Sequence, residues 1–100
     1  MNIDLSPRFQ ELVHEQIGII KAVKYHEDAA RWFNGLIEKI SVLDTFPEAG
    51  RLSRVPDLAN NGIREIVYGT FIAYYVIQGD VCRLISLRRC EMNIASTSDL

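Results

Sequence analysis

Six arginines in the second half of the chain are the residues best suited to recognise another molecule. Residues 51–90 contain six arginines and only three acidic residues, whereas residues 1–50 contain five cations and eight acids. A guanidinium group forms paired hydrogen bonds with a carboxylate or a phosphate. The second half is therefore predicted to bind an acidic protein segment or a nucleic-acid backbone, with ordinary solvated charge as the alternative. The candidate contact residues are Arg64, Arg83, Arg88 and Arg89.

Arg64 is the first candidate because it begins a predicted strand beside a long loop, and its alternative role is an ion pair with Glu65 or a helix acid. Arg51 is assigned a structural role, in which its guanidinium satisfies loop carbonyls. Tyr74 and Tyr75 must point to opposite faces of their strand, so one is predicted to lie in the core and the other to contact a partner. Tyr75 is included among the candidate contact residues.

The sequence offers few residues suited to catalysis or to metal binding. Cys82 and Cys90 have no neighbouring histidine, which argues against a thiolate nucleophile or a zinc site. His14 and His26 stand alone on predicted helices. We therefore predict no catalytic site, no metal, no cofactor and no small-molecule substrate, and two reduced thiols instead of a disulfide framework.

The first 46 residues are predicted to form mainly two helices. Ser6-Pro7 is typical of a helix start, with Ser as the N-cap and Pro in the first turn. Apolar residues at three- and four-residue spacing predict one amphipathic helix that ends near Lys24 and a second that begins at residues 26–28 and is stopped by Pro47. Gly35, inside the second helix, predicts close packing against the sheet or the first helix.

The rest of the chain is predicted to be a long loop followed by three strands. Residues 47–62 are rich in Pro, Gly and Asn, which is typical of a loop. β-Branched and aromatic residues then predict strands at 63–68, 71–78 and 81–88. Gly79-Asp80 predicts a two-residue turn of type II′, so the three strands should form an antiparallel meander.

Together with a short first strand at residues 2–5, these elements predict an α+β fold of order β-αα-βββ. A helical hairpin would cover one face of a small antiparallel sheet and leave the other face partly open. Residues 1–90 would be the single domain, and residues 91–100 a tail with little to pack. No apolar stretch approaches the length of a membrane span, and no signal peptide is visible, so a cytoplasmic protein is expected.

The order of these elements and three local sequences resemble the ParE/RelE toxin superfamily over residues 3–90. The resemblance implies a toxin of a type II toxin–antitoxin module of the plasmid stabilisation type, silenced by a cognate antitoxin. Members of this superfamily either cut mRNA on the ribosome or poison DNA gyrase. The sequences that carry the resemblance are Leu5-Ser6-Pro7, then Phe46-Pro47-Glu48-Ala49-Gly50-Arg51 with Val55-Pro56-Asp57-Leu58, then Ile63 to Gly69 and Tyr74 to Ile77.

The residue inventory favours the gyrase-directed function within this resemblance. RNA cleavage needs a general base and a general acid, yet no Lys follows Lys39 and no His or Tyr follows Tyr75. Ile72 replaces an arginine that is common in the superfamily, and Arg89 stands where a histidine often follows the last strand. The alternatives are a ribosome-dependent mRNA endonuclease and a degenerate member that only binds its antitoxin.

Overall fold

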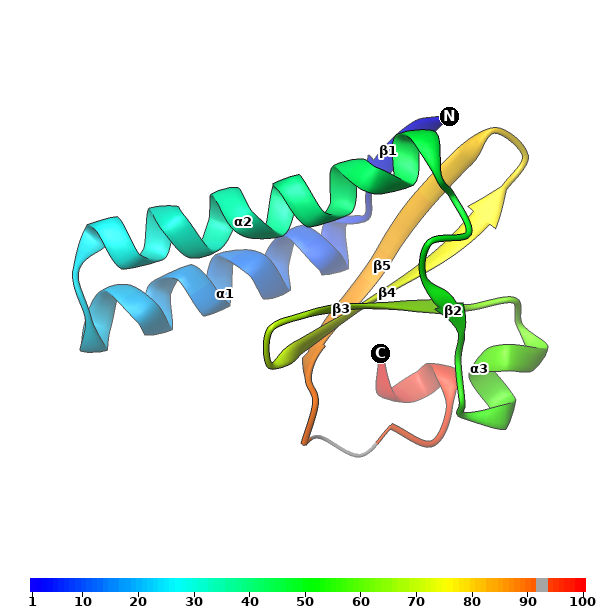
Figure 1. Ribbon diagram of the computed structural model, residues 1–100. Coiled ribbons are helices and arrows are strands. Elements are labelled where there is room, and N and C mark those ends of the chain that lie inside the picture. Colours follow the sequence, from blue (N-terminus) through cyan, green and yellow to red (C-terminus); the bar gives the residue numbers. More distant parts are fainter. Residues whose placement is uncertain (92–93) are drawn as a thin grey trace.

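A helical hairpin covers one face of a five-stranded sheet (Figure 1), which confirms the predicted α+β class. The computed structural model describes residues 1–91 and 94–100. The hairpin turn projects beyond the sheet (Figure 1). The elements are β1 (Asn2–Leu5), α1 (Pro7–Val23), α2 (His26–Thr45), β2 (Arg51–Leu52), α3 (Pro56–Asn60), β3 (Arg64–Tyr68), β4 (Phe71–Gln78), β5 (Val81–Arg89) and a 3₁₀ turn, η1 (Thr97–Asp99).

The sheet has the strand order β1-β5-β4-β3-β2 and is mixed, not wholly antiparallel. Strands β3, β4 and β5 form the predicted antiparallel meander. Strand β1 runs parallel to β5, from the pair Asn2↔Val81 to the pair Leu5↔Leu84. The prediction of an antiparallel sheet is therefore wrong at this edge. No local pattern indicates this pairing, because its partners lie about eighty residues apart in the chain.

The two turns of the meander depend on glycines with positive φ. Gly69 has φ of 58° and Gly79 has φ of 62°, in the left-handed region that glycine adopts without strain. Gln78 pairs with Val81, so the second loop has two residues, and Asp80 has a negative φ. A type I′ turn would need positive φ at both positions. The backbone therefore agrees with the predicted type II′ turn.

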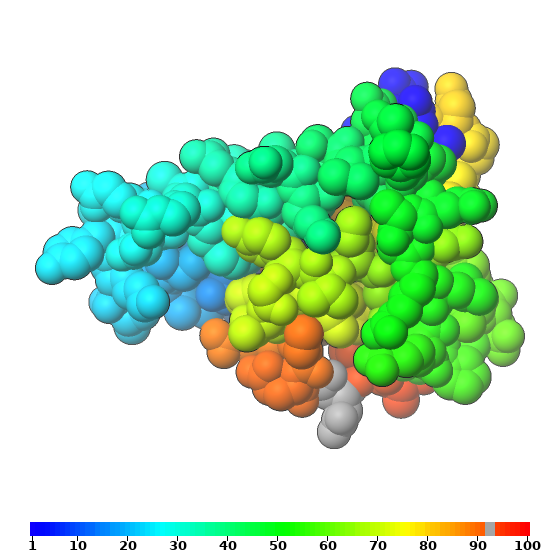
Figure 2. All heavy atoms as spheres, in the orientation of Figure 1, coloured from blue at the N-terminus to red at the C-terminus, as the bar shows by residue number. Residues whose placement is uncertain are grey.

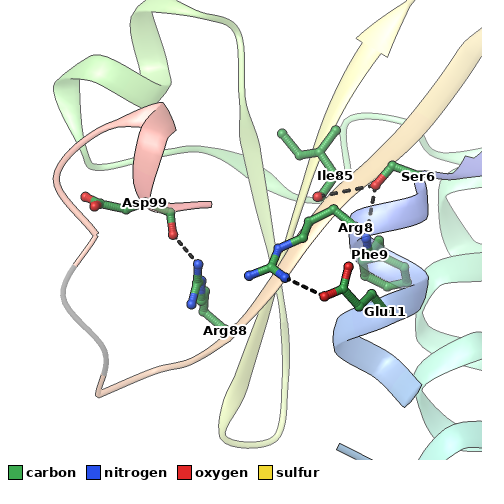
Figure 3. A network of polar contacts seen from close by, with 7 residues as sticks. All are labelled: Ser6, Arg8, Phe9, Glu11, Ile85, Arg88 and Asp99. Carbon is green, nitrogen blue, oxygen red and sulfur yellow. Dashed lines mark hydrogen bonds and ion pairs between the residues drawn. The ribbon is translucent and has the colours of Figure 1, made fainter. Parts of the chain in front are cut away.

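Ser6 joins the start of α1 to β5 (Figure 3). Its hydroxyl accepts a hydrogen bond from the Phe9 amide at 3.1 Å and donates one to the Ile85 carbonyl at 3.3 Å. Its own amide donates to the Leu84 carbonyl at 2.9 Å. The predicted N-cap is thus confirmed, and the same side chain also satisfies a strand carbonyl beyond the end of β1.

We expect Ser6→Ala to lower the free energy of unfolding by about 0.5–2 kcal/mol, because the first turn of α1 loses its cap. The loss should fall in the upper part of that range, since the Ile85 carbonyl loses its donor as well. Urea denaturation checks this, with Ser41→Ala on the exposed face of α2 as the control, expected within about 0.5 kcal/mol of wild type. Equal stability of both variants would contradict the double role of Ser6.

Gly35 confirms the close packing predicted for it. The Tyr68 hydroxyl donates to the Trp32 carbonyl at 2.8 Å, and a Cβ added at Gly35 would collide with that hydroxyl. The Tyr68 side chain, which comes from β3, can therefore pass across α2 only because Gly35 has no side chain.

Residues 47–62 are not one long loop, which corrects the prediction. They contain β2, which pairs Arg51 with Glu65, and the five-residue helix α3, which begins at Pro56. Neither element is long enough to show a periodic pattern in the sequence.

A second, smaller hydrophobic cluster lies on the sheet face opposite the helical hairpin. Its buried members are Leu58 of α3, Ile63 and Tyr74. Ile94 and Leu100 pack against them, so the expectation that residues 91–100 have little to pack is wrong for these two side chains. Residues 92 and 93 of the predicted tail lie outside the described residues. The face predicted to be partly open is therefore covered in part by α3 and the C-terminal residues, which lie on the side of the sheet away from the helical hairpin (Figure 1).

Among the described residues, no helix is both long enough and apolar enough to cross a membrane.

Candidate functional site

A β-bulge in β5 decides which arginines share a face of the sheet. Tyr74 pairs with Ser86 and Tyr75 pairs with Leu84, so Ile85 is an extra residue in β5. Because of this extra residue, Leu84 and Leu87 both face the main core although they are three positions apart. Strict alternation would have placed Arg88 with Leu84 on the helical face. The bulge moves Arg88 to the opposite face.

The four predicted arginines are divided between the two faces of the sheet. Arg88 pairs across the sheet with Ile72 of the second cluster, and Arg83 points to the same face. Arg64 and Arg89 instead pair with the core residues Tyr75 and Phe71, so they lie on the face that carries the helices. The four arginines therefore do not form a single binding site.

Arg64 is held by the loop that precedes β2. Its Nη1 donates to the Gly50 carbonyl at 2.7 Å, and its Nη2 lies 4.0 Å from the Glu48 carboxylate. Arg51 pairs instead with the Glu65 carboxylate, its Nε lying 3.6 Å from Oε1. The prediction that Arg51 satisfies loop carbonyls is wrong, because Arg64 performs that role.

Arg83 and Arg89 are both accessible on the surface. Arg83 donates to the Asp4 carboxylate at 2.9 Å, an exposed ion pair between neighbouring strands that contributes little to stability. Arg89 lies 5.6 Å from the centre of the Phe71 ring and 3.6 Å from the Glu91 carboxylate. Both guanidinium groups could reach a partner without unfolding the sheet.

Tyr75, one of the predicted contact residues, lies in the main core instead. Its side chain is 0% exposed, its hydroxyl donates to the Pro47 carbonyl at 2.7 Å, and it accepts from the Gly50 amide at 2.9 Å. Burial raises the pKa of Tyr75 above its ordinary value of 10.0. Tyr74 is also buried, in the second cluster. The prediction of a Tyr75 contact is therefore corrected, since neither tyrosine is open to a partner.

A row of polar side chains crosses the second face of the sheet. Glu65, Tyr74 and Ser86 are neighbours on β3, β4 and β5, and all three are buried. The Glu65 carboxylate accepts from the Ser53 hydroxyl at 2.8 Å, whereas the Ser86 hydroxyl has no hydrogen-bond partner among the described residues. Burial and then the nearby Glu65 charge raise the pKa of Tyr74 above 10.0.

Sequence reasoning missed this row because its members belong to three separate strands. Each residue alone is an ordinary polar residue in an apolar strand, and only the register brings Glu65 beside Tyr74 and Tyr74 beside Ser86. A polar residue among apolar neighbours in each strand was the available signal.

Arg88 borders the row and is in contact with the C-terminal residues (Figure 3). Its Nη2 donates to the Asp99 carbonyl, and its buried Nε has no partner among the described residues. Backbone hydrogen bonds from Ala95 and Ser96 lower the pKa of the Asp99 carboxyl below its ordinary value of 3.8. The Arg88 guanidinium therefore already donates a hydrogen bond to the C-terminal residues of the same chain.

A groove runs along α1 on the side next to the end of β5, and we call it the α1 groove. It consists of two hollows that share Gln16, Ile19 and Arg89. Trp32 lines it, and the Trp32 indole Nε1 is buried without a hydrogen-bond partner among the described residues. Four cations and two acids line the groove, namely Lys24, Arg31, Arg88 and Arg89 with Glu15 and Asp28.

The edge of β5 beside this groove is unpaired. Strand β1 pairs with β5 only as far as Leu84, and among the described residues no strand pairs with the outer edge from Ser86 to Arg89. An apolar groove beside a free strand edge can accept an extended or helical peptide.

Within the described residues, no three His, Cys, Asp or Glu side chains gather as a metal site would require.

The arrangement of elements is similar to that of a solved chain from the "Chromosomal ParDE TA system from P. aeruginosa". The two chains align with a TM-score of 0.75 at 18% sequence identity, over 89% of this chain and 95% of the other. This chain has a ParDE-like fold. The resemblance predicted from the sequence is thereby confirmed for the fold. No protein-family model and no curated protein sequence matches the chain.

Proposed function

We propose that this chain is the toxin of a type II toxin–antitoxin module, acting in the cytoplasm and silenced by a cognate antitoxin. The similarity of almost the whole chain to a ParDE chain carries the proposal. The FPEAGR loop and the strands that follow it support the same function, because they resemble the ParE/RelE superfamily in order and spacing. Fold alone does not determine function, so the proposal also depends on which surfaces the molecule offers to a partner.

The α1 groove is the surface that we propose for the antitoxin. Its floor includes Ile19, Phe71 and Leu87, and its rim carries more cations than acids. A partner segment that adds to the free edge of β5 would bring its side chains over this floor. An acidic, partly apolar segment fits best, because carboxylates could pair with Arg89 and with the cations near the hairpin turn.

DNA gyrase is the target that we propose. Ribonucleolytic catalysis needs a group that can accept a proton, and arginine remains protonated at neutral pH. A specific observation favours mRNA cleavage as the second candidate, since Glu65, Tyr74 and Arg88 lie close together on the second face. The Glu65 carboxylate is nevertheless buried and held by Ser53 and Arg51. A carboxylate in these contacts is poorly placed to act as a general base.

Induction of this chain alone in bacteria tests the function and separates the targets. We expect growth to stop, with DNA breaks appearing before protein synthesis falls. Cleaved mRNA and an immediate fall in translation would favour the second candidate. Unimpaired growth at full expression would overturn the toxin proposal and leave a chain that only binds a partner.

The proposed antitoxin surface predicts that Ile19→Lys weakens antitoxin binding by about tenfold or more, since a charge would enter the apolar floor. Ile19 is 48% exposed, so the fold should survive the substitution. Trp32 is the only tryptophan of the chain and lines the groove, so a titration followed by its fluorescence measures the affinity.

The matched control is Val42→Lys, which replaces a similarly exposed aliphatic side chain on α2 outside this groove. The control should bind the antitoxin as wild type does. Equal affinity of the Ile19 and Val42 variants would place the antitoxin elsewhere on the molecule.

A further inference from the structure

Residues 94–100, which we call the C-terminal cover, lie across the second face of the sheet. Ile94 and Leu100 pack against the cluster that contains Leu58 and Tyr74. The turn η1 lies close to α3, where the Thr97 amide donates to the Asp57 carboxylate at 2.9 Å (Figures 1 and 2). The cover therefore spans the gap between α3 and the end of β5.

The polar contacts of the cover are of the kind that another peptide could make. The Asp99 carbonyl accepts from the Arg88 guanidinium (Figure 3), and the Asp99 carboxylate accepts from the amides of Ala95 and Ser96 at 2.8 and 3.1 Å. None of these bonds belongs to a strand ladder. Any segment that offers a carbonyl or carboxylate to Arg88 could replace its hydrogen bond to the Asp99 carbonyl.

The cover is held weakly for its length. Ordering seven residues opposes its attachment, and the only apolar anchors in its described contacts are two side chains that remain partly exposed. On the same face of the sheet, the Ser86 hydroxyl and the Arg88 Nε are buried without hydrogen-bond partners among the described residues. We therefore expect the C-terminal cover to detach from the second face while the sheet stays folded.

The composition of the second face favours a polypeptide as its external ligand. Leu58 and Ile72 provide apolar contacts, and Arg88 provides the hydrogen-bond donor. The Asp57 carboxylate lies on the same face and accepts a hydrogen bond from the Thr97 amide. It could bind an amide of another peptide in the same way, but it would repel a phosphate of a nucleic acid.

We propose that the C-terminal cover is a ligand bound in cis to a peptide-binding surface, and that a partner segment with apolar side chains and a carbonyl or carboxylate for Arg88 displaces it. This surface lies on the opposite face of the sheet from the floor of the α1 groove proposed for the antitoxin, and Arg88 lies at the boundary of both. The inference goes beyond the proposed function, and either can hold without the other.

The test uses the full-length variant Ile94→Ser/Leu100→Ser, whose cover has lost its apolar anchors. The probe is an acetylated heptapeptide with the sequence of residues 94–100, added to ¹⁵N-labelled protein. We expect the amide signals of Leu58, Tyr74 and Arg88 to shift, with a dissociation constant on the order of millimolar. Wild type should bind the probe at least about tenfold more weakly, because its own cover competes at a high effective concentration.

A probe with serine as its last residue is the control and should cause no shifts. Shifts in neither protein, or equal affinity for both proteins, would overturn the proposal. An oligoribonucleotide that moves the same signals more strongly than the peptide would also overturn it, because the surface would then favour nucleic acid.

Hydrogen exchange of the wild-type chain tests the opening without any substitution. The amides of Ala95, Ser96 and Thr97 should exchange at least about a hundredfold faster than the paired amides of β4 and β5. Protection equal to that of the sheet would show a cover that opens only when the whole chain unfolds, which contradicts displacement. Neither experiment depends on toxicity in cells.

Discussion

Replacing Gly50 by alanine is expected to lower the free energy of unfolding by about 1–3 kcal/mol. A Cβ at this position would lie 2.6 Å from the Glu65 carbonyl oxygen and 2.6 Å from Cε1 of Tyr75. The Glu65 backbone is fixed between β2 and β4, and the Tyr75 ring is enclosed in the core, so neither can give way easily. The loop would have to move, and Arg64 would lose its contact with the Gly50 carbonyl.

Gly18→Ala in α1 is the matched control, since nothing lies within 4 Å of a Cβ added there. That substitution should stabilise the protein by up to about 1 kcal/mol, because alanine favours a helix interior. Urea denaturation of both variants measures the difference. Similar stability of the two variants would mean that Gly50 does not provide the close approach between the loop and the sheet.

Tyr75→Phe is expected to lower the free energy of unfolding by about 1–3 kcal/mol while the volume of the core is kept. The loss arises because the Gly50 amide and the Pro47 carbonyl each lose a buried hydrogen-bond partner. Tyr25→Phe, at an exposed tyrosine in the hairpin turn, is the control and should change stability by less than about 0.5 kcal/mol. A stable Tyr75→Phe variant would mean that water or loop motion satisfies these two groups.

The difference in stability between wild type and Tyr75→Phe is expected to depend on pH. Burial raises the folded-state pKa of Tyr75 above 10.0, so the folded protein holds this proton more tightly than the unfolded chain does. The stability due to the neutral hydroxyl is present below pH 10 and is lost as the pH rises through the folded-state pKa. The advantage of wild type over Tyr75→Phe should therefore shrink above pH 10. A constant difference between pH 7 and pH 11 would contradict this cause.

The sequence by itself determined the elements whose signals are local. The cap at Ser6, the stop before Pro47 and the turns at Gly69 and Gly79 each depend on residues only a few positions apart. The three strands of the meander follow for the same reason, because residues joined by tight turns pair with their nearest neighbours in the chain. Two of the three motifs that resemble the ParE/RelE superfamily lie in these local elements, whereas the motif at residues 46–51 and 55–58 lies in the segment where β2 and α3 were not predicted.

The tertiary structure decided which side chains are available on the surface. The bulge at Ile85 places Arg88 on the second face and Arg89 on the helical face. The Tyr75 hydroxyl is buried because the loop at Gly50 closes over it. The parallel pairing of β1 and the packing of Leu100 on the second face likewise join distant parts of the chain. Contacts of this kind arise from how the whole chain fills one small core, so no window of the sequence could reveal them. The arginines were therefore identifiable from sequence as candidates, but only the fold could show which of them share a surface.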